Sequence, residues 1–369
     1  MKGIIHYIEN LRLSALLILS FCLTLFVSCS SDDESGGEQP KPVTVHMVFV
    51  AGATNNVMRE LNYPDAIATT ILNENIMRDL TVAIFDNTGV VIGYYSDNVS
   101  NVALSVQTVN ITTHAAPNCT VYAIANAGKD YFNDCTTKAQ YDAKKTTTLT
   151  SAEALGNANE TVMFGKAVSQ NIVQGATIGA IEMEHVCSKV DVYVEPKQSE
   201  NITVTGWQLH HVPDGAYITD DNTNAWTGNF LDFTPVTSQT ITGSNPSTAQ
   251  KIATYYLYQN YAGKVAGLTT EKDRNKDNAP TGASYLTIDA ETVEWQSVFR
   301  VYLGGVKLTD ATDDYTDFNV YLNRNYTVTV TINGSNNTDV RITHKDIMPI
   351  TFTATVEALT TDDRTITFQ

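Results

Sequence analysis

Alternation of apolar and polar residues is the main pattern in this chain. Residues 43–50 read Val-Thr-Val-His-Met-Val-Phe-Val, which places Val43, Val45, Met47 and Phe49 on one face. A period of two predicts a half-buried β-strand. Alternating or β-branched stretches predict further strands at residues 80–85, 90–95, 102–106, 119–125, 162–164, 178–183, 185–194, 202–209, 252–258, 283–289, 295–303, 326–332, 350–356 and 365–368.

Turn residues separate these predicted strands, and few segments show a helical period. Asp-Asn-Thr-Gly at 86–89 lies between two β-prone runs and predicts a hairpin with a positive φ at the glycine. Pro196 ends a long alternating run and is a plausible domain boundary. The pattern predicts an all-β chain of two antiparallel β-sandwich domains in tandem, of transthyretin- or immunoglobulin-like type, at residues 43–197 and 198–369.

The first 42 residues have a different pattern. Lys2 and Arg12 flank a weakly polar start, residues 15–27 are mostly apolar, and the apolar run stops at Cys29. This layout is typical of a secretory signal, and the run is shorter than the ~20 apolar residues that a membrane-spanning helix needs. The end of the run resembles a bacterial lipobox, and the acidic stretch 30–34 resembles a surface-export tag of Bacteroidota lipoproteins. We therefore predict a lipoprotein signal at 1–28, lipidation of Cys29 and a spacer at 29–42. An ordinary signal peptide and an uncleaved anchor are the alternatives.

Net charge narrows the choice of partners. The chain has 369 residues and a formal net charge of −17, which disfavours nucleic acid and anionic membrane surfaces. Three of its five cysteines, Cys119, Cys135 and Cys187, follow the spacer. An odd number leaves at least one unpaired thiol, and whether Cys119 and Cys135 are bridged stays open.

Candidate catalytic and metal-binding residues are sparse. The sequence contains no GxSxG, HExxH, GxGxxG or Walker-type motif, so we expect no enzyme, no cofactor and no metal. His210 and His211 are adjacent, and neighbouring strand residues point to opposite faces. An acidic group lacks the fixed spacing of a calcium loop and is better interpreted as a solvated turn. It comprises Asp310, Asp313, Asp314 and Asp317.

A group of tyrosines is the remaining candidate for ligand binding. In a strand, such residues usually pack in the core or across strands, although they can also form a platform for sugars. They are Tyr255, Tyr256, Tyr258 and Tyr261.

Several segments together resemble the fimbrillin family, the subunits of type V pili. After the lipobox-like Cys29, the spacer and the strand at 43–50 comes a loop that holds Arg59. The stretches that then resemble family markers, in the same order, are 75–86, 120–128 ending in Ala-Asn-Ala-Gly, 183–194, 255–260 with Gly263, and 318–332. At Gln259 an amide replaces the acid that is usual in the family.

The resemblance implies a mode of assembly. An Arg-specific protease would cut after Arg59, with Arg78 as the alternative, and would remove the first strand. A C-terminal strand of another subunit would then fill the groove, in the manner of β-augmentation. The self-assembly residues would be Val43, Val45, Met47 and Phe49 in the first strand and Ile350, Phe352, Ala354 and Val356 in the donor strand.

The resulting prediction is an exported outer-membrane lipoprotein that forms part of a cell-surface fimbria used in adhesion. Its partners would be other fimbrial subunits, the protease, the membrane lipid and an unidentified surface ligand. The alternative is a surface lipoprotein that binds glycans and does not polymerise. A stalk, tip or anchor position stays open.

Overall fold

The computed structural model describes residues 42–50, 77–99, 107–157, 161–196, 202–219, 225–237, 241–242, 249–310, 312–335, 337–346 and 350–358. It describes the backbone alone at residues 47–50, 107–108, 157, 180, 242, 337–339, 341–346 and 350–358. Cys29, Arg59 and the strands predicted at 102–106 and 365–368 lie outside the described residues.

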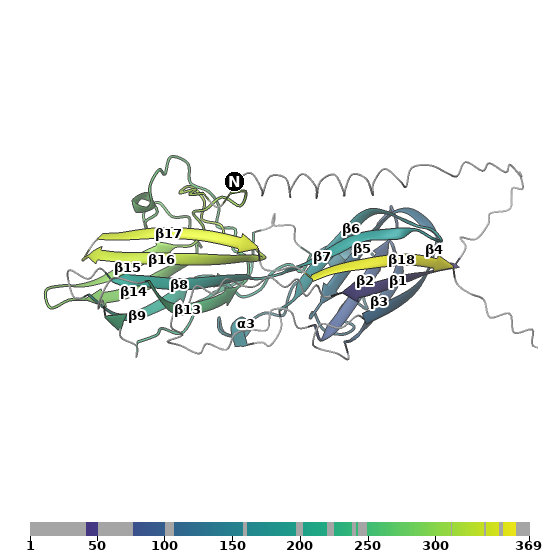
Figure 1. The fold of residues 1–369 in the computed structure, drawn as a ribbon, viewed down its shortest axis with the longest axis horizontal. Coiled ribbons are helices and arrows are strands. Elements are labelled where there is room, and N and C mark those ends of the chain that lie inside the picture. The colour runs from purple at the N-terminus through teal and green to yellow at the C-terminus, as the bar shows by residue number, and fades with distance from the viewer. Residues whose placement is uncertain are drawn as a thin grey trace, which may run out of the picture. The chain divides into compact units, whose positions relative to one another are not determined.

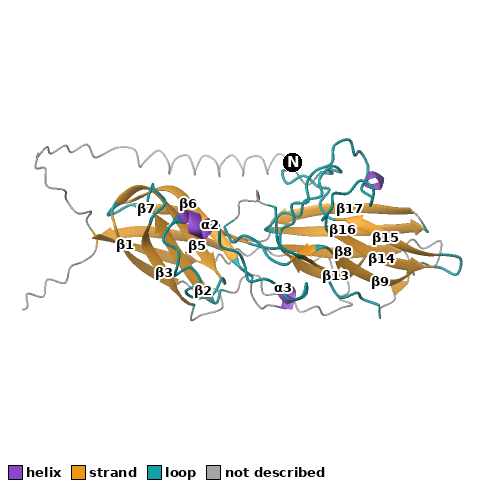
Figure 2. Cartoon of the chain, turned by 180° about the vertical axis from the view of Figure 1, so that it is seen from behind, coloured by secondary structure: helices purple, strands orange, loops and turns teal. Residues whose placement is uncertain are grey.

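Strands make up most of the described chain, and helices are few and short (Figure 2). The strands are β1 Pro42–Val50, β2 Asp79–Phe85, β3 Val91–Asn98, β4 Gln107–His114, β5 Ala116–Ala125, β6 Met163–Ile172, β7 Thr177–His185, β8 Ser188–Pro196, β9 Thr203–His210, β10 Val212–Pro213, β11 Phe230–Leu231, β12 Ile241–Thr242, β13 Gln250–Leu257, β14 Tyr285–Glu291, β15 Gln296–Tyr302, β16 Arg324–Gly334, β17 Asn337–Asp346 and β18 Ile350–Ala358. The helical segments are α2 Lys138–Asp142, α3 Ala154–Asn157 and the 3₁₀ turn η2 Glu271–Asp273.

An eight-stranded sheet contains both the first and the last described strands, in the order β3-β2-β5-β6-β7-β18-β1-β4 (Figure 1). Only two residue pairs, Met163↔His185 and Phe164↔Glu184, join β6 to β7. The sheet therefore divides into two four-stranded parts, β3-β2-β5-β6 and β7-β18-β1-β4. Side chains of both parts share one hydrophobic core that includes Val45, Val82 and Ile111.

The predicted hairpin at 86–89 connects β2 and β3. Gly89 has φ +84°, and its amide donates to the carbonyl of Asp86 at 3.0 Å. The carboxylate of Asp86 accepts the amide hydrogen of Thr88 at 2.9 Å. The glycine prediction is confirmed, because a positive φ is costly for residues with a Cβ.

All seven residues of β2 are buried, because the segment that follows β5 covers the second face of β2. Within this segment, Thr137 and Gln140 form a capping box at the start of α2. Tyr141 packs edge-on against Phe85, with ring centroids 5.0 Å apart. A strand covered on both faces loses the polar alternation of a half-buried strand.

Two four-stranded sheets, β12-β9-β14-β15 and β13-β8-β16-β17, share a second core. Most of their strand pairs are antiparallel, as predicted. The pair β8–β16 is parallel, because the long chain between these strands returns β16 in the direction of β8. Strand β17, which the sequence pattern did not predict, pairs with β16.

The sheets do not follow the order of the chain. Strand β8 pairs with β13 and β16, whereas β18 pairs with β7 and β1. The division into domains at residues 43–197 and 198–369 stays a prediction. In the described part of the chain, we find no helix of the length and hydrophobicity that crossing a membrane requires.

Candidate functional site: the paired strands β1 and β18

Strand β1 presents its apolar residues to the core, as its alternation predicts. Val43 is 4% exposed and Val45 is fully buried, whereas Thr44 and His46 between and after them are half-buried. Both valines belong to the core of the eight-stranded sheet. The predicted orientation is thus confirmed for residues 43–46.

Hydrogen-bonded neighbours flank β1 on both sides. Eight residue pairs join it to β18, and eight join it to β4. Val45 lies opposite Val356 of β18 and Ile111 of β4. An interior strand of this kind satisfies two rows of backbone groups at once, so its removal would leave a gap one strand wide between β18 and β4.

The fold brings the two predicted self-assembly strands together within one chain (Figure 1). Residues of one set are partners of the other in the pairs Val45↔Val356, Met47↔Ala354 and Phe49↔Phe352. Directly opposite residues of an antiparallel pair share a face of the sheet, so the two alternations are in phase.

Strand β18 is also an interior strand. Its second edge pairs with β7, from Ile350↔Met183 to Thr355↔Thr177, with a register shift between Phe352 and Ala354. Residues 350–358 therefore complete their own sheet, whereas the sequence pattern suggested a terminal strand awaiting another copy.

Of the two predicted cleavage sites, only Arg78 is among the described residues. Arg59 falls within residues 51–76, which are not described. Arg78 is exposed, but its amide donates to Asn126 Oδ1 at 2.8 Å and its carbonyl accepts from the Val99 amide at 2.7 Å. The bond after Arg78 leads directly into buried β2. Proteases act on exposed, extended segments, so Arg78 is the poorer substrate in the folded protein.

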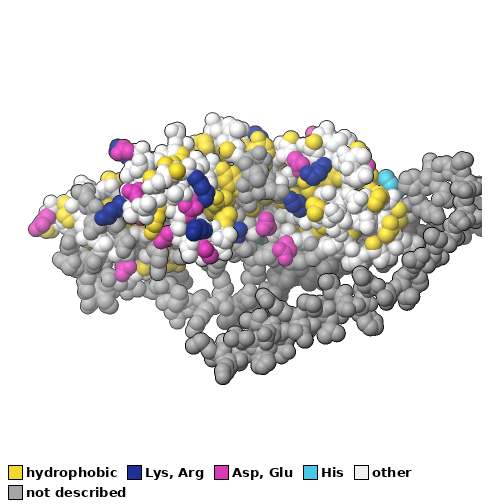
Figure 3. All heavy atoms as spheres, turned by 90° about the horizontal axis from the view of Figure 1, so that it is seen from above, with side chains coloured by type: hydrophobic (Ala, Val, Ile, Leu, Met, Phe, Trp, Pro, Cys, Tyr) yellow, Lys and Arg dark blue, Asp and Glu magenta, His cyan; other side chains and the backbone are white. Residues whose placement is uncertain are grey.

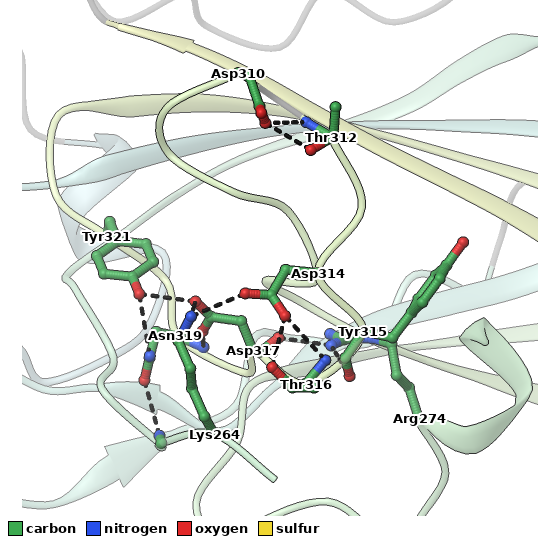
Figure 4. Close-up of polar contacts among 11 residues, drawn as sticks. Lys264, Arg274, Asp310, Thr312, Asp314, Tyr315, Thr316, Asp317, Asn319 and Tyr321 are labelled. Carbon is green, nitrogen blue, oxygen red and sulfur yellow. Dashed lines mark hydrogen bonds and ion pairs between the residues drawn. The ribbon is translucent and has the colours of Figure 1, made fainter. Parts of the chain in front are cut away.

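The acidic group near the C-terminal sheets is neutralised by its neighbours (Figure 4). Lys264 Nζ lies 2.9 Å from both Asp314 Oδ2 and Asp317 Oδ2. The hydroxyl of Tyr321 donates to Asp317 Oδ2 at 2.8 Å, and Asp310 accepts from Thr312. The described residues contain no group of three or more His, Cys, Asp or Glu that is arranged to hold a metal.

The same contacts explain the pKa shifts of Lys264 and Asp314. The hydrogen bond to Asp314 is the largest contribution to the raised pKa of Lys264. Burial by itself would raise the pKa of Asp314, but hydrogen bonds from Thr316 and Lys264 outweigh it and lower the pKa overall. A carboxylate already paired with an ammonium group is poorly suited to bind calcium.

The two adjacent histidines, His210 and His211, have different contacts. The ring of His210 stacks on Tyr285, with centroids 4.7 Å apart, and its Nδ1 lies 3.2 Å from Asp232 Oδ2. His211 has φ +62°, and its ring packs on Phe230.

Three of the four tyrosines pack in the interior: Tyr255, Tyr256 and Tyr258 are 7%, 4% and 4% exposed. Tyr261 is half-buried, and its ring packs edge-on against Tyr321 with centroids 5.5 Å apart. On the face seen in Figure 3, basic and acidic side chains are interspersed with small apolar areas. Cys119, Cys135 and Cys187 are buried free thiols, and burial raises the pKa of Cys119 and Cys135.

Comparison with known proteins supports the resemblance found in the sequence. Residues 44–206 match the family model described as the major fimbrial subunit protein, FimA. The match confirms the resemblance to the fimbrillin family for this part of the chain. Residues 255–330 match a second model, described as a domain of unknown function, DUF4906. A comparison with curated proteins found no match.

Solved structures show the same fold. One is the tip fimbrial protein Mfa3 from Porphyromonas gingivalis with a C-terminal truncation, at 14% identity and a TM-score of 0.56, covering 83% of this chain and 100% of that chain. Another is a fimbrilin from Porphyromonas gingivalis W83, at 12% identity and a TM-score of 0.51, covering 81% and 96%. These structures show the fold, and the family match at 44–206 supports a fimbrial subunit at the cell surface that associates with other fimbrial proteins.

Sequence reasoning missed two features of this protein. It did not place β18 beside β1, because partners about 300 residues apart leave no local signal. It also gave no indication that Arg274, which is only 2% exposed, is buried. Gly305, which has a positive φ, leaves room for the buried arginine, but a glycine does not identify such a site from sequence.

Proposed function

We propose that this protein is a structural subunit of a type V fimbria, assembled by protease-triggered strand exchange and used in adhesion. In this proposal the protein is exported as a lipoprotein and held in the outer membrane through lipid on Cys29. No catalytic activity is assigned to it. The observation that supports the proposal most is the interior position of β1, between β18 and β4.

Excision of β1 would leave an apolar slot. Val43 and Val45 fill part of the core, and burying a side chain of this size contributes about 1.5–3 kcal/mol. The backbone groups of β18 and β4 that pair with β1 would lose their partners as well. A strand from another subunit that alternates in the same way would restore both contributions.

The C-terminal segment is suited to be that strand, because 350–358 already pairs with β1 in phase. To act in another subunit, it would have to leave β7 of its own chain. Only residues 347–349 separate it from β17 in a different sheet. In the slot left by β1 it would pair with β18 and β4 of the other subunit, and these new contacts would offset the loss of its pairing with β7.

The arginines support a cut in the loop before β2. Of the arginines in the described residues, Arg300, Arg324 and Arg341 lie in strands, and Arg78 lies at the start of one. Arg274 is buried. Arg59 in the 51–76 connection is therefore the preferred site for release of β1.

Limited proteolysis tests this assembly mechanism. Mature wild-type protein, Arg59→Ala and a matched Arg78→Ala control would be treated with an Arg-specific protease and examined by native gels, electron microscopy and N-terminal sequencing. We expect polymers from wild type and Arg78→Ala, and uncut monomers from Arg59→Ala. Polymers from Arg59→Ala would contradict cleavage at Arg59.

A chain that ends at residue 346 tests the donor. We expect it to be exported and cut but to remain monomeric, with circular dichroism as the check that its sheets persist. Polymers from this truncation would show that the donor lies elsewhere. Monomers from every processed variant would instead favour the glycan-binding lipoprotein.

Lipidation has its own test. Cys29→Ala should lose incorporation of labelled palmitate and should no longer be retained in the outer membrane, because stable anchoring needs more than one acyl chain. Unchanged labelling of Cys29→Ala would contradict lipidation at this residue.

A further inference from the structure

Arg274 is buried, whereas the residues next to it in the loop are exposed or half-buried. The flanking Lys272 and Lys276 are exposed, as are residues 275, 277 and 278. Arg274 itself is 2% exposed, and its side chain points inward. An exposed polar loop is the usual place for proteolytic nicking, so the burial of its one arginine calls for an explanation.

The guanidinium group of Arg274 fits a socket made of backbone oxygens (Figure 4 shows part of it). Nη1 donates to the carbonyls of Asp317 at 2.6 Å and Tyr315 at 3.3 Å. Nη2 donates to the carbonyls of Leu303 at 2.7 Å and Tyr302 at 3.1 Å. Four acceptors around one planar cation match the fixed fork of the arginine side chain.

Two further groups close the socket. Glu271 Oε2 lies 3.2 Å from Arg274 Nε, and the ring of Phe318 lies 4.4 Å from the guanidinium carbon. A Cβ on Gly305 would lie 2.9 Å from that carbon, so a larger residue at 305 would displace the arginine. The site therefore depends on contributions from the segments 271–274, 302–305 and 315–318.

Cleavage after an arginine requires the protease to enclose the guanidinium group in its own pocket. At Arg274 this would require every one of these contacts to be broken first, and the rate would follow the small population of the open loop. Among the described arginines, Arg274 is the one that lies in a loop away from any strand. Strand structure protects the others, and the socket takes that role here.

We propose that the Arg274 socket makes the 264–283 loop resistant to the Arg-specific protease that would release β1. This inference rests on the proposed function for the identity of the protease. A subunit processed by such an enzyme must lose one strand without being cut elsewhere, and a buried side chain supplies this selectivity without removing the loop.

The test compares two proteases and one matched variant of the full mature protein. Intact mass would be followed during limited digestion of wild type and Lys276→Arg with an Arg-specific protease, and of wild type with a Lys-specific protease. We expect cleavage after residue 276 in Lys276→Arg, and cleavage after Lys272 or Lys276 by the Lys-specific enzyme. Cleavage after Arg274 should be at least about 100-fold slower than cleavage after position 276 in the variant, because only the open form is cut at Arg274.

Two outcomes would overturn the inference. Cleavage after Arg274 as fast as at the introduced site would show that the socket gives no protection. If the loop resisted the Lys-specific protease in wild type and the Arg-specific protease in Lys276→Arg, its backbone, and not the buried side chain, would be what prevents cleavage. The released β1 fragment differs in mass from the products of cleavage in the 264–283 loop, so the two events are scored separately. Failure of cleavage in residues 51–76 would bear on the proposed function and not on the socket.

Discussion

The eight-stranded sheet and the two C-terminal four-stranded sheets are completed by different parts of the chain. Strands β1 and β18, from opposite ends of the described chain, fill the middle of one half of the eight-stranded sheet. In the C-terminal sheets, the edge strands β15 and β17 each pair with the strand before them in sequence. The Arg274 socket ties the loops there together.

This difference distinguishes strands that another subunit could replace from contacts that must stay in place during assembly. A terminal strand can leave its sheet without breaking the chain elsewhere, and an identical strand can replace it. A hairpin strand and a buried ion pair have no such replacement. We expect the eight-stranded sheet to supply the variable connection between subunits and the C-terminal sheets to stay folded throughout assembly.

The largest expected effect contrasts a core position in β1 with an edge position in β15. Val45 is fully buried, and Val45→Asp should destabilise the protein by about 4 kcal/mol or more, because it buries an unpaired carboxylate. Val298 is 66% exposed, and Val298→Asp should change the free energy of unfolding by less than about 0.5 kcal/mol. Urea denaturation measures both, and equal losses would show that β1 is not packed as described.

The second prediction concerns the buried cation. Arg274→Met should cost about 3 kcal/mol, because it removes hydrogen bonds to four carbonyl oxygens and the ion-pair partner of Glu271. Arg300 is exposed and stacks on Tyr285, so the matched Arg300→Met should cost less than about 1 kcal/mol. Thermal unfolding of the two variants tests whether Arg274→Met is the more destabilising. Unchanged stability of Arg274→Met would show that the socket does not stabilise the fold.

The third prediction is a pH dependence that originates at Glu271. Burial raises the pKa of Glu271 from 4.5 to about 7, against the attraction of Arg274 and with a further rise from Asp313. Between these two pH values the folded protein binds the proton and the unfolded chain does not. The contribution of Glu271 to stability is therefore fully present below pH 4.5 and is lost as the pH rises to 7.

Glu271→Gln removes this titration and serves as the reference. Relative to this variant, the wild type should lose about 2 kcal/mol in the free energy of unfolding between pH 4.5 and 8. Urea denaturation at several pH values measures the difference. A constant difference, or one that grows with rising pH, would contradict the raised pKa.

The smallest predicted effect compares two buried tyrosines. The hydroxyl oxygen of Tyr326 accepts from the amide of Tyr321 at 2.9 Å, so Tyr326→Phe should cost about 1 kcal/mol. The buried hydroxyl of Tyr141 has no hydrogen-bond partner among the described residues, so Tyr141→Phe should be neutral or slightly stabilising. Chemical denaturation separates the two, and a larger loss at Tyr141 would indicate a partner such as a bound water.

The sequence alone determined the β character of the chain and the side of β1 that faces the core. A period of two is a local property, and so is the hairpin glycine at 89, whose φ is positive in the structure. The ordered motifs also led to the fimbrillin family, which the match at 44–206 supports. Strand β4 at Gln107–His114 and strand β17 were missed, because each contains only two apolar residues among polar ones.

Tertiary structure decided which strands are neighbours and which polar residues are buried. Val45 and Val356 are partners although 311 positions separate them, and no local period encodes such a distance. Arg274 lies among exposed residues in the sequence, and only the carbonyls of 302, 303, 315 and 317 converge to bury it. Alternation specifies the face of a strand, whereas its position in a sheet and the partners of a charge depend on packing of the whole chain.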